Sequence, residues 1–403
     1  MITLAGCPVS LTGLMGWTYP ITDYSRGDMV QLAPDGGYLV VGRAGNVDGG
    51  GNTRMLAARI ASNGDLMASA VFDGLYQGTG ATRCGVGSID DSGIITLAGV
   101  DHTDDFPSIS VNPPGRLRII QTDSLFNTLL DRTYGEDIQW RVETVLGAPD
   151  GSVYLGGVQK FRTSNPERNF ILKLEANGEV VVLGEYGDRA SDRSSLLRWV
   201  GDSSFATNGD IVLTGYKSAA DFDMYKTDFA LLRIRTDGSM VWLKSFEKPG
   251  SQEAYALTAL PGGSFLLAGK SDEKTPTDRY PYLIKADADG NEVWARDDIL
   301  GFEPVRSDYE IWDMAVDTDG SIVIVGQGRT ISYPGGIGVL PVEGRDSFII
   351  KLDSYGNNIW TKSLDPAYLY GVCLTDHGTY MTVGTVTDNL TLIEVDRNGN
   401  VVN

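Results

Sequence analysis

The chain has 403 residues, of which 42% are hydrophobic, so it carries enough apolar surface to bury a large core. Its 53 acidic residues outnumber its 33 basic residues and give a net charge of −20, which argues against binding to the phosphate backbone of nucleic acids. No apolar run approaches the roughly 18 residues that a membrane-spanning helix needs.

The N-terminus allows two interpretations. The sequence from Leu4 to Cys7, Leu-Ala-Gly-Cys, matches the end of a bacterial lipoprotein signal, in which Cys7 would carry a lipid anchor. The residues before it are too few for the apolar part of such a signal and include no basic residue. The same five residues, Ile-Thr-Leu-Ala-Gly, occur at 2–6 and at 95–99, where we predict an inner strand. Residues 1–12 therefore stay without an assigned place.

A run of apolar residues that ends in glycine recurs seven times along the chain. The first copy ends at Gly42, and successive glycines follow at intervals of 54 to 58 residues. A period this constant indicates a repeat architecture. The seven glycines are Gly42, Gly99, Gly157, Gly215, Gly269, Gly326 and Gly384.

After these runs comes a second signature, which consists of two strands joined by a tight turn. Its clearest copy covers residues 348–363, where Trp360 follows the turn residue Gly356 by four positions. We interpret this tryptophan as structural. The spacing recurs between Gly238 and Trp242 and between Gly290 and Trp294, whereas Ala68 replaces the tryptophan in the first unit and Phe126 replaces the turn glycine in the second.

Each unit can be divided into four antiparallel strands, numbered here from the inside outwards. Asp-Gly and Asn-Gly pairs between the apolar runs are strong hairpin signals, and helical periodicity is absent. Four such strands repeated seven times predict an all-β fold, a seven-bladed β-propeller that occupies residues 1–403 as a single domain. The last unit lacks its fourth strand, so we expect residues 13–20 to supply it and to close the ring.

The pattern of a glycine-ended strand followed by Phe-x-Leu-x-Lys-Leu-Asp-x-x-Gly-Asn-x-x-Trp resembles the repeat propellers of bacterial secreted and surface proteins. The resemblance covers the chain from about Gly13 to Asn403. It implies a scaffold with no shared chemistry, and it therefore transfers no catalytic residue to this chain. We expect the protein to be extracellular, exposed on a cell surface or associated with a virus particle.

Long, irregular loops are expected on only one face of the ring. The first-to-second and third-to-fourth turns are tight, whereas the loops between the second and third strands are long, and such loops on a rigid scaffold commonly carry function. The expected loops cover residues 43–54, 100–116, 158–168, 216–228, 270–281 and 327–346.

Three aromatic residues occupy an equivalent position near this face. Tyr255, Trp312 and Tyr370 each precede the glycine of the first-to-second turn by eight residues, which places them near the channel mouth. One interpretation is a stacking platform for a sugar or a peptide side chain. The other is that the three rings pack between neighbouring blades.

Asp101, Asp104 and Asp105 lie in one of the expected loops and form the densest group of potential oxygen ligands, which would suit calcium. A solvated acidic loop is the alternative. Residues 287–292 also resemble a calcium loop, but the equivalent residues in other units are ordinary turns.

The sequence offers little for catalysis. The only histidines are His102 and His377, and His377 falls in a tight turn on the opposite face. We therefore expect a non-enzymatic recognition propeller that binds a protein or a glycan on its long-loop face. A carbohydrate-active enzyme and a structural spacer in a larger assembly remain alternatives.

Overall fold

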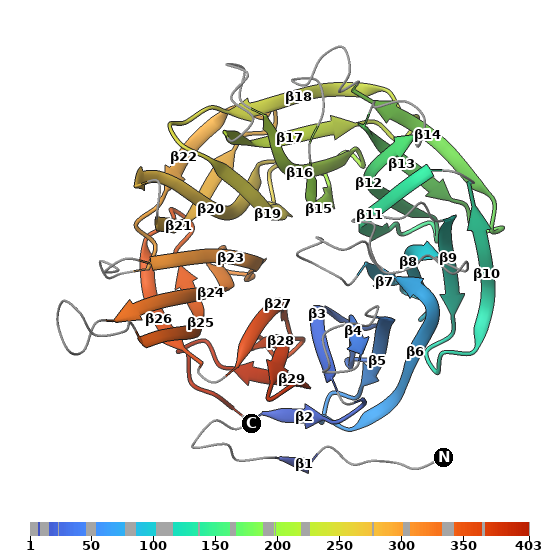
Figure 1. The fold of residues 1–403 in the computed structure, drawn as a ribbon, viewed down its shortest axis with the longest axis horizontal. Coiled ribbons are helices and arrows are strands. Elements are labelled where there is room, and N and C mark those ends of the chain that lie inside the picture. Colours follow the sequence, from blue (N-terminus) through green and yellow to red (C-terminus); the bar gives the residue numbers. More distant parts are fainter. Residues whose placement is uncertain are drawn as a thin grey trace.

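In the computed structural model, strands form a ring around a central axis (Figure 1). Every secondary-structure element of the described residues is a β-strand, and none of these residues forms an apolar helix long enough to cross a membrane. The described residues are 7–8, 16–22, 24–45, 54–76, 86–101, 116–135, 138–161, 167–187, 197, 199–218, 226–275, 278–300, 307–332, 342–364 and 367–402.

Hydrogen bonds join the strands into five sheets. The sheet that contains both chain ends has the order β1 (Cys7–Pro8), β2 (Trp17–Tyr19), β29 (Asn389–Val395), β28 (Tyr380–Val386), β27 (Tyr368–Leu374). Two sheets have four strands, β11 (Ile138–Gly147), β12 (Val153–Phe161), β13 (Glu167–Leu174), β14 (Val180–Tyr186) and β15 (Trp199–Phe205), β16 (Ile211–Ser218), β17 (Thr227–Ile234), β18 (Met240–Phe246).

The other two sheets have eight strands each. One runs β10 (Thr128–Tyr134), β9 (Arg116–Thr122), β8 (Ile95–Asp101), β6 (Leu66–Tyr76), β5 (Arg54–Ile60), β4 (Tyr38–Gly45), β3 (Tyr24–Leu32), with β7 (Gly87–Ile89) beside β8. The other runs β19 (Gln252–Ala259), β20 (Phe265–Thr275), β21 (Asp278–Ala286), β23 (Ser307–Val316), β24 (Ile322–Ser332), β25 (Val342–Leu352), β26 (Asn358–Ser363), with β22 (Glu292–Arg296) beside β21.

The prediction of seven separate blades with four strands each is therefore wrong, because the ring consists of five sheets. Neighbouring repeat units merge at two places. The long strand β6 reaches β8 and pairs with it at Leu75 and Tyr76, and β21 pairs with β23 in parallel at Arg279. The seven sequence repeats are thus distributed over five hydrogen-bonded sheets.

The N-terminal strand completes the last unit. β2 pairs antiparallel with β29, with Trp17 opposite Leu392. A Cβ atom placed on Gly64 would lie 2.1 Å from the Trp17 ring. The equivalent glycines abut the other tryptophans in the same way, at 3.0 Å for Gly290 and Trp242, 3.0 Å for Gly356 and Trp294, and 3.1 Å for Gly399 and Trp360.

Each of these tryptophans lies against the turn glycine of the next unit, where a side chain would collide with it. These turn glycines also have positive φ angles, such as 82° at Gly356. The turn of the second unit has Phe126 in place of glycine, with a φ angle of 63°. The Phe126 ring packs edge-on against the ring of Phe72 in β6, with ring centres 6.3 Å apart. Ala68 stands at the position where four other units carry tryptophan.

The recurrent glycine at the end of the second strand has a separate cause. In most innermost strands the pairing register slips by one residue opposite this glycine, which marks a β-bulge. The bulge brings a backbone carbonyl close, so that a Cβ atom on Gly42 would lie 1.9 Å from the oxygen of Arg26. The extra residues of these bulges are Asp28, Glu143, Gly201, Tyr255, Trp312 and Tyr370.

Candidate functional site

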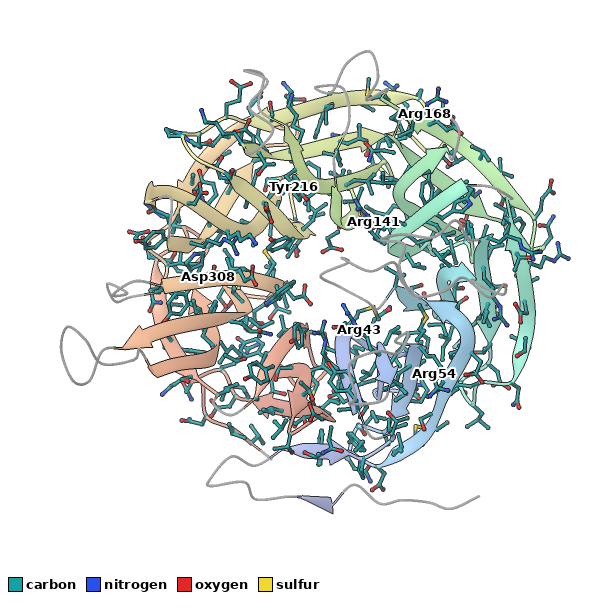
Figure 2. All side chains as sticks on the ribbon, viewed as in Figure 1. Arg43, Arg54, Arg141, Arg168, Tyr216 and Asp308 are labelled. Carbon is teal, nitrogen blue, oxygen red and sulfur yellow. The ribbon has the colours of Figure 1, made fainter. Side chains whose placement is uncertain are left out.

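The central end of each unit is built from its two innermost strands. β3 begins at Tyr24 and β4 ends at Gly45, so residues near these ends lie on the face from which the second-to-third loops leave. We call this central end of the ring the channel mouth. The charged residues that form two ion-pair groups there include Arg26, Asp28, Arg43, Glu253, Lys270 and Glu310, and Figure 2 shows Arg43 beside the centre of the ring.

On one side of the channel mouth, two arginines hold one buried carboxylate. Asp28 accepts hydrogen bonds from Nε of Arg26 at 2.6 Å and from Nε of Arg43 at 3.2 Å. The Arg26 guanidinium lies 3.7 Å from the ring centre of Tyr370. Burial lowers the pKa of Arg26, but Asp28 and the nearby tyrosines outweigh burial and leave it above its ordinary value. This side therefore carries a net positive charge.

On the other side, one lysine bridges two glutamates. Nζ of Lys270 lies 3.2 Å from the Glu253 carboxylate and 3.0 Å from that of Glu310. It also lies 5.1 Å from the ring centre of Tyr255, whose hydroxyl donates to Glu253. Burial, reinforced by the two glutamates, raises the pKa of Tyr255 well above its ordinary value, so its hydroxyl stays protonated. The three charged groups leave a net negative charge.

The three predicted aromatic residues do lie together, but they are buried. Tyr255, Trp312 and Tyr370 are 1%, 6% and 9% exposed. Tyr255 stacks on Trp312 with ring centres 5.4 Å apart, and Trp312 meets Tyr370 at 5.7 Å. These contacts cross from β19 to β23 and from β23 to β27, which fits packing between units. Direct contact of the three rings with a ligand stays a prediction.

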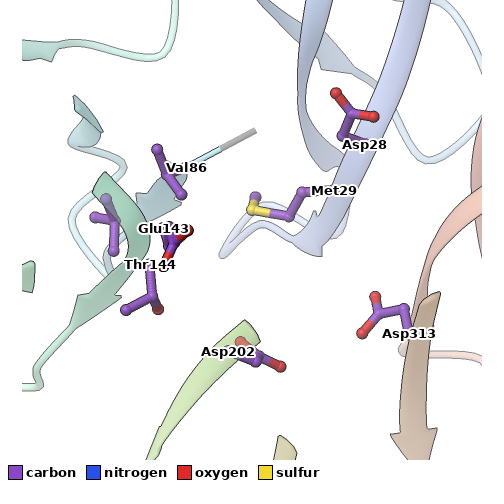
Figure 3. A pocket seen from close by; sticks show the side chains of 9 residues that line it. Asp28, Met29, Val86, Glu143, Thr144, Asp202 and Asp313 are labelled. Atoms are coloured by element: carbon purple, nitrogen blue, oxygen red, sulfur yellow. The ribbon is translucent and has the colours of Figure 1, made fainter. Parts of the chain in front are cut away.

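A cavity of about 70 Å³ lies where several innermost strands meet (Figure 3). Carboxylates on its wall accept hydrogen bonds from backbone N–H groups of the next unit. Glu143 accepts the N–H of Val200 at 2.7 Å, and Asp202 accepts that of Leu257 at 3.0 Å. Asp313 accepts from Val372 in the same way, at 3.0 Å. The lining residues are Asp28, Met29, Val86, Gly87, Glu143, Thr144, Val145, Asp202 and Asp313.

The four acidic residues of the cavity wall were not singled out from the sequence, although the repeat pattern contains a signal for Asp28 and Glu143. The offset of eight residues that locates Tyr255 before Gly263 also leads from Gly36 back to Asp28 and from Gly151 back to Glu143. All three are extra residues of bulges. Counting this offset in every unit, whatever the residue type, would have located the acidic bulge residues as well.

The predicted calcium ligands cannot be compared with the structure. Asp101 ends β8, while its side chain, Asp104 and Asp105 lie outside the described residues. Within the described ranges, no group of three or more histidine, cysteine, aspartate or glutamate residues could hold a metal ion. His102 is likewise outside these ranges, and His377 is an exposed turn residue beside Asp376.

The calcium-like stretch at 287–292 is a hydrogen-bonded turn. One carboxylate oxygen of Asp287 accepts the N–H groups of Asp289 and Asn291, at 2.9 and 2.8 Å, and the other accepts the Asn291 amide at 3.1 Å. These hydrogen bonds lower the pKa of Asp287. Asp353 and Asn357 repeat the arrangement, so it belongs to the fold of the turn.

The long loops fall mostly outside the described residues, at 46–53, 102–115, 162–166, 219–225 and 333–341. Two expected loops contain more strand than predicted. In residues 270–281, β20 continues to Thr275 and β21 begins at Asp278, and in residues 327–346, β24 continues to Ser332 and β25 begins at Val342. The charged and polar residues of 270–281 give no apolar alternation, which is why that stretch read as a loop.

No protein-family model matches the chain, and no curated protein matches its sequence. Among solved structures, a puromycin hydrolase variant matches 96% of the chain with a TM-score of 0.58 and 15% identity, and the match spans 55% of that enzyme's chain. The β-propeller domain of the Trilobed protease from Pyrococcus furiosus gives a TM-score of 0.51 at 11% identity, over 94% of this chain and 98% of that one. The WD40 β-propeller domain of Doa1 gives a TM-score of 0.51 at 14% identity, and the match covers 98% of this chain and 97% of that one. These likenesses show that the fold is a β-propeller.

Proposed function

We propose that the chain is a non-enzymatic recognition propeller that binds a partner protein at its channel mouth, on a cell surface or a virus particle. The observation that carries the proposal is the pair of oppositely charged groups fixed there, Arg26 with Arg43 on one side and Glu253 with Glu310 on the other. Likeness to the WD40 domain of Doa1 supports the scaffold on which such a mouth is built.

Fixed charges of both signs suit a protein partner better than a neutral glycan. Arg26 and Arg43 are 13% and 18% exposed, and Glu253 and Glu310 are 30% and 23% exposed, so a ligand at the mouth can reach them. Their ion pairs hold them in place before binding, which lowers the entropy lost on association. A partner with the complementary charge pattern gains orientation and association rate from these groups.

The test presents the immobilised chain with a phage library of random peptides and, separately, with a glycan array. We expect peptides with both acidic and basic residues to be enriched and to lose affinity at high salt. Arg43→Gln and Glu310→Gln should each weaken the selected peptide by about tenfold or more. Arg235→Gln is the matched control, because Arg235 is exposed in a third-to-fourth turn on the opposite face.

Two results would contradict the proposal. Selected glycans with no selected peptide would favour carbohydrate recognition, and turnover of a bound glycan would favour a carbohydrate-active enzyme. Binding that survives both substitutions at the mouth but not the control substitution would move the site to the opposite face.

A further inference from the structure

Glu143 holds two neighbouring units together at the wall of the central cavity. It is the extra residue of the β11 bulge, and its side chain is 3% exposed. One carboxylate oxygen accepts the N–H of Val200 in β15, at 2.7 Å, and the other lies 2.5 Å from Nε of Arg141. We call the contact between the innermost strands of neighbouring units a seam. Glu143 thus provides a direct hydrogen bond across the β11–β15 seam.

We propose that Glu143 makes the β11–β15 seam a proton-controlled latch, which is held closed while the carboxyl group is protonated and opens more readily once it is ionised. An ionised carboxylate at this depth is stabilised by one arginine and one backbone N–H, and opening the seam would return it to water. Figure 3 shows Glu143 on the cavity wall opposite Asp28 and Asp313.

The other seams with a carboxylate differ from this one. Asp202 and Asp313 are partly exposed, and each accepts a second N–H from its own strand, that of Ser203 at 2.8 Å and that of Met314 at 2.9 Å. Glu143 is the most deeply buried of these three carboxylates, and among the described residues it accepts one backbone N–H hydrogen bond where each aspartate accepts two.

Among the described ionisable groups around Glu143, Arg141 is the cation in contact with it. Arg141 of β11 touches it, and Asp202 of β15, Asp28 of β3 and Asp313 of β23 line the same cavity. Among the described side chains of the other adjacent strands, β9 carries Arg116 and Arg118, β12 carries Tyr154, and β7 and β8 carry none. Arg118 pairs with Asp131, and Tyr154 lies beneath Lys173.

The direction of the pH effect follows from linkage. Burial raises the pKa of Glu143 from its ordinary value of 4.5 to about 7, against the opposing effects of Arg141 and the Val200 N–H. In an opened seam the group regains its ordinary pKa, so between these values the closed form holds a proton that the open form releases. Opening should therefore become easier by up to about tenfold per pH unit across this window and level off above it.

Hydrogen–deuterium exchange of peptides that contain Val200 tests the latch, under conditions where exchange reports the opening equilibrium and after correction for the intrinsic pH dependence. We expect protection in the native chain to fall between about pH 5 and 7, and to be nearly constant with pH in Glu143→Gln, which keeps an acceptor but cannot ionise. Peptides that contain Leu257 and Val372 are internal controls and should show no such slope.

Arg141→Met provides a second variant, should Glu143→Gln fail to fold. Removing the cation raises the pKa of Glu143 further, so the window in which protection falls should move to higher pH. The proposal is overturned if the native slope persists in Glu143→Gln, if the window stays in place in Arg141→Met, or if the control peptides show the same slope. The readout needs no ligand, so it is independent of the proposed partner binding.

Discussion

The seams on the two sides of the ring differ in whether aromatic rings take part. Between β11, β15 and β19, the carboxylates of Glu143 and Asp202 accept backbone N–H groups of the next unit. Between β19, β23 and β27, the rings of Tyr255, Trp312 and Tyr370 contact one another in succession, and Asp313 adds a carboxylate link of the first kind to the Val372 N–H. The bulge and its opposing glycine recur on both sides, so the fold requires the backbone geometry and leaves the bulge side chain free to vary. Recurrence of aromatic residues at this position thus has a packing explanation that needs no ligand.

Trp312→Ala should produce the largest effect on the aromatic side. Its ring is buried between those of Tyr255 and Tyr370, so its removal deletes both ring contacts and leaves a cavity. We expect a loss of about 3–5 kcal/mol in the free energy of unfolding, measured by denaturant titration. Affinity for a selected peptide should change little in the folded variant. A small loss of stability with a large loss of affinity would instead make the aromatic group the binding platform.

Alanine at the bulge glycines should cost nearly the same on both sides. A Cβ atom on Gly157 would lie 2.0 Å from the carbonyl oxygen of Arg141, and one on Gly269 would lie 1.9 Å from that of Glu253. Either substitution forces the backbone apart, at a cost of about 1–3 kcal/mol. Unfolding titrations of Gly157→Ala and Gly269→Ala test this, and a clear difference between them would show that the side chain of the bulge controls its geometry.

Removing a carboxylate should cost less than removing a stacked ring. Asp202→Ala leaves the N–H of Leu257 without its acceptor across the β15–β19 seam. Because Asp202 is partly exposed, water can replace it in part, and we expect a loss of about 1–2 kcal/mol in the free energy of unfolding. Exchange at Leu257 should increase more than exchange at Val200. Equal increases at both amides would mean that the two seams open together.

The repeat was predictable because its causes are local. Turn glycines require positive φ angles, as at Gly356, and the second-strand glycines face a carbonyl, as at Gly42, so both kinds leave a mark in every unit. The number of sheets was not predictable. It depends on a few hydrogen bonds between units, those of Leu75 and Tyr76 with β8 and that of Arg279 with β23, and no residue pattern distinguishes these strand ends from others.

The candidate site was predictable only in part. The eight-residue offset identified Tyr255, Trp312 and Tyr370 as equivalent positions, and all three are bulge residues in the structure. The sequence left open whether the rings face a ligand or pack between units, because a bulge interrupts the alternation from which the orientation of strand side chains is judged. One ion pair of the channel mouth, that of Lys270 with Glu310, joins strands of different units, and such a pair has no signature in local sequence.

The smallest expected effect lies where the aromatic side meets the first unit. The Arg26 guanidinium covers the ring of Tyr370 at 3.7 Å and pairs with Asp28. Arg26→Lys keeps the positive charge but loses the planar stack, so we expect a loss of about 0.5–1 kcal/mol in the free energy of unfolding. Tyr370→Leu supplies the control background, in which the same substitution should cost less because the ring is gone. If Arg26→Lys costs as much with leucine at position 370 as with tyrosine, the ion pair with Asp28 inside β3, rather than the ring stack across the seam, accounts for the loss.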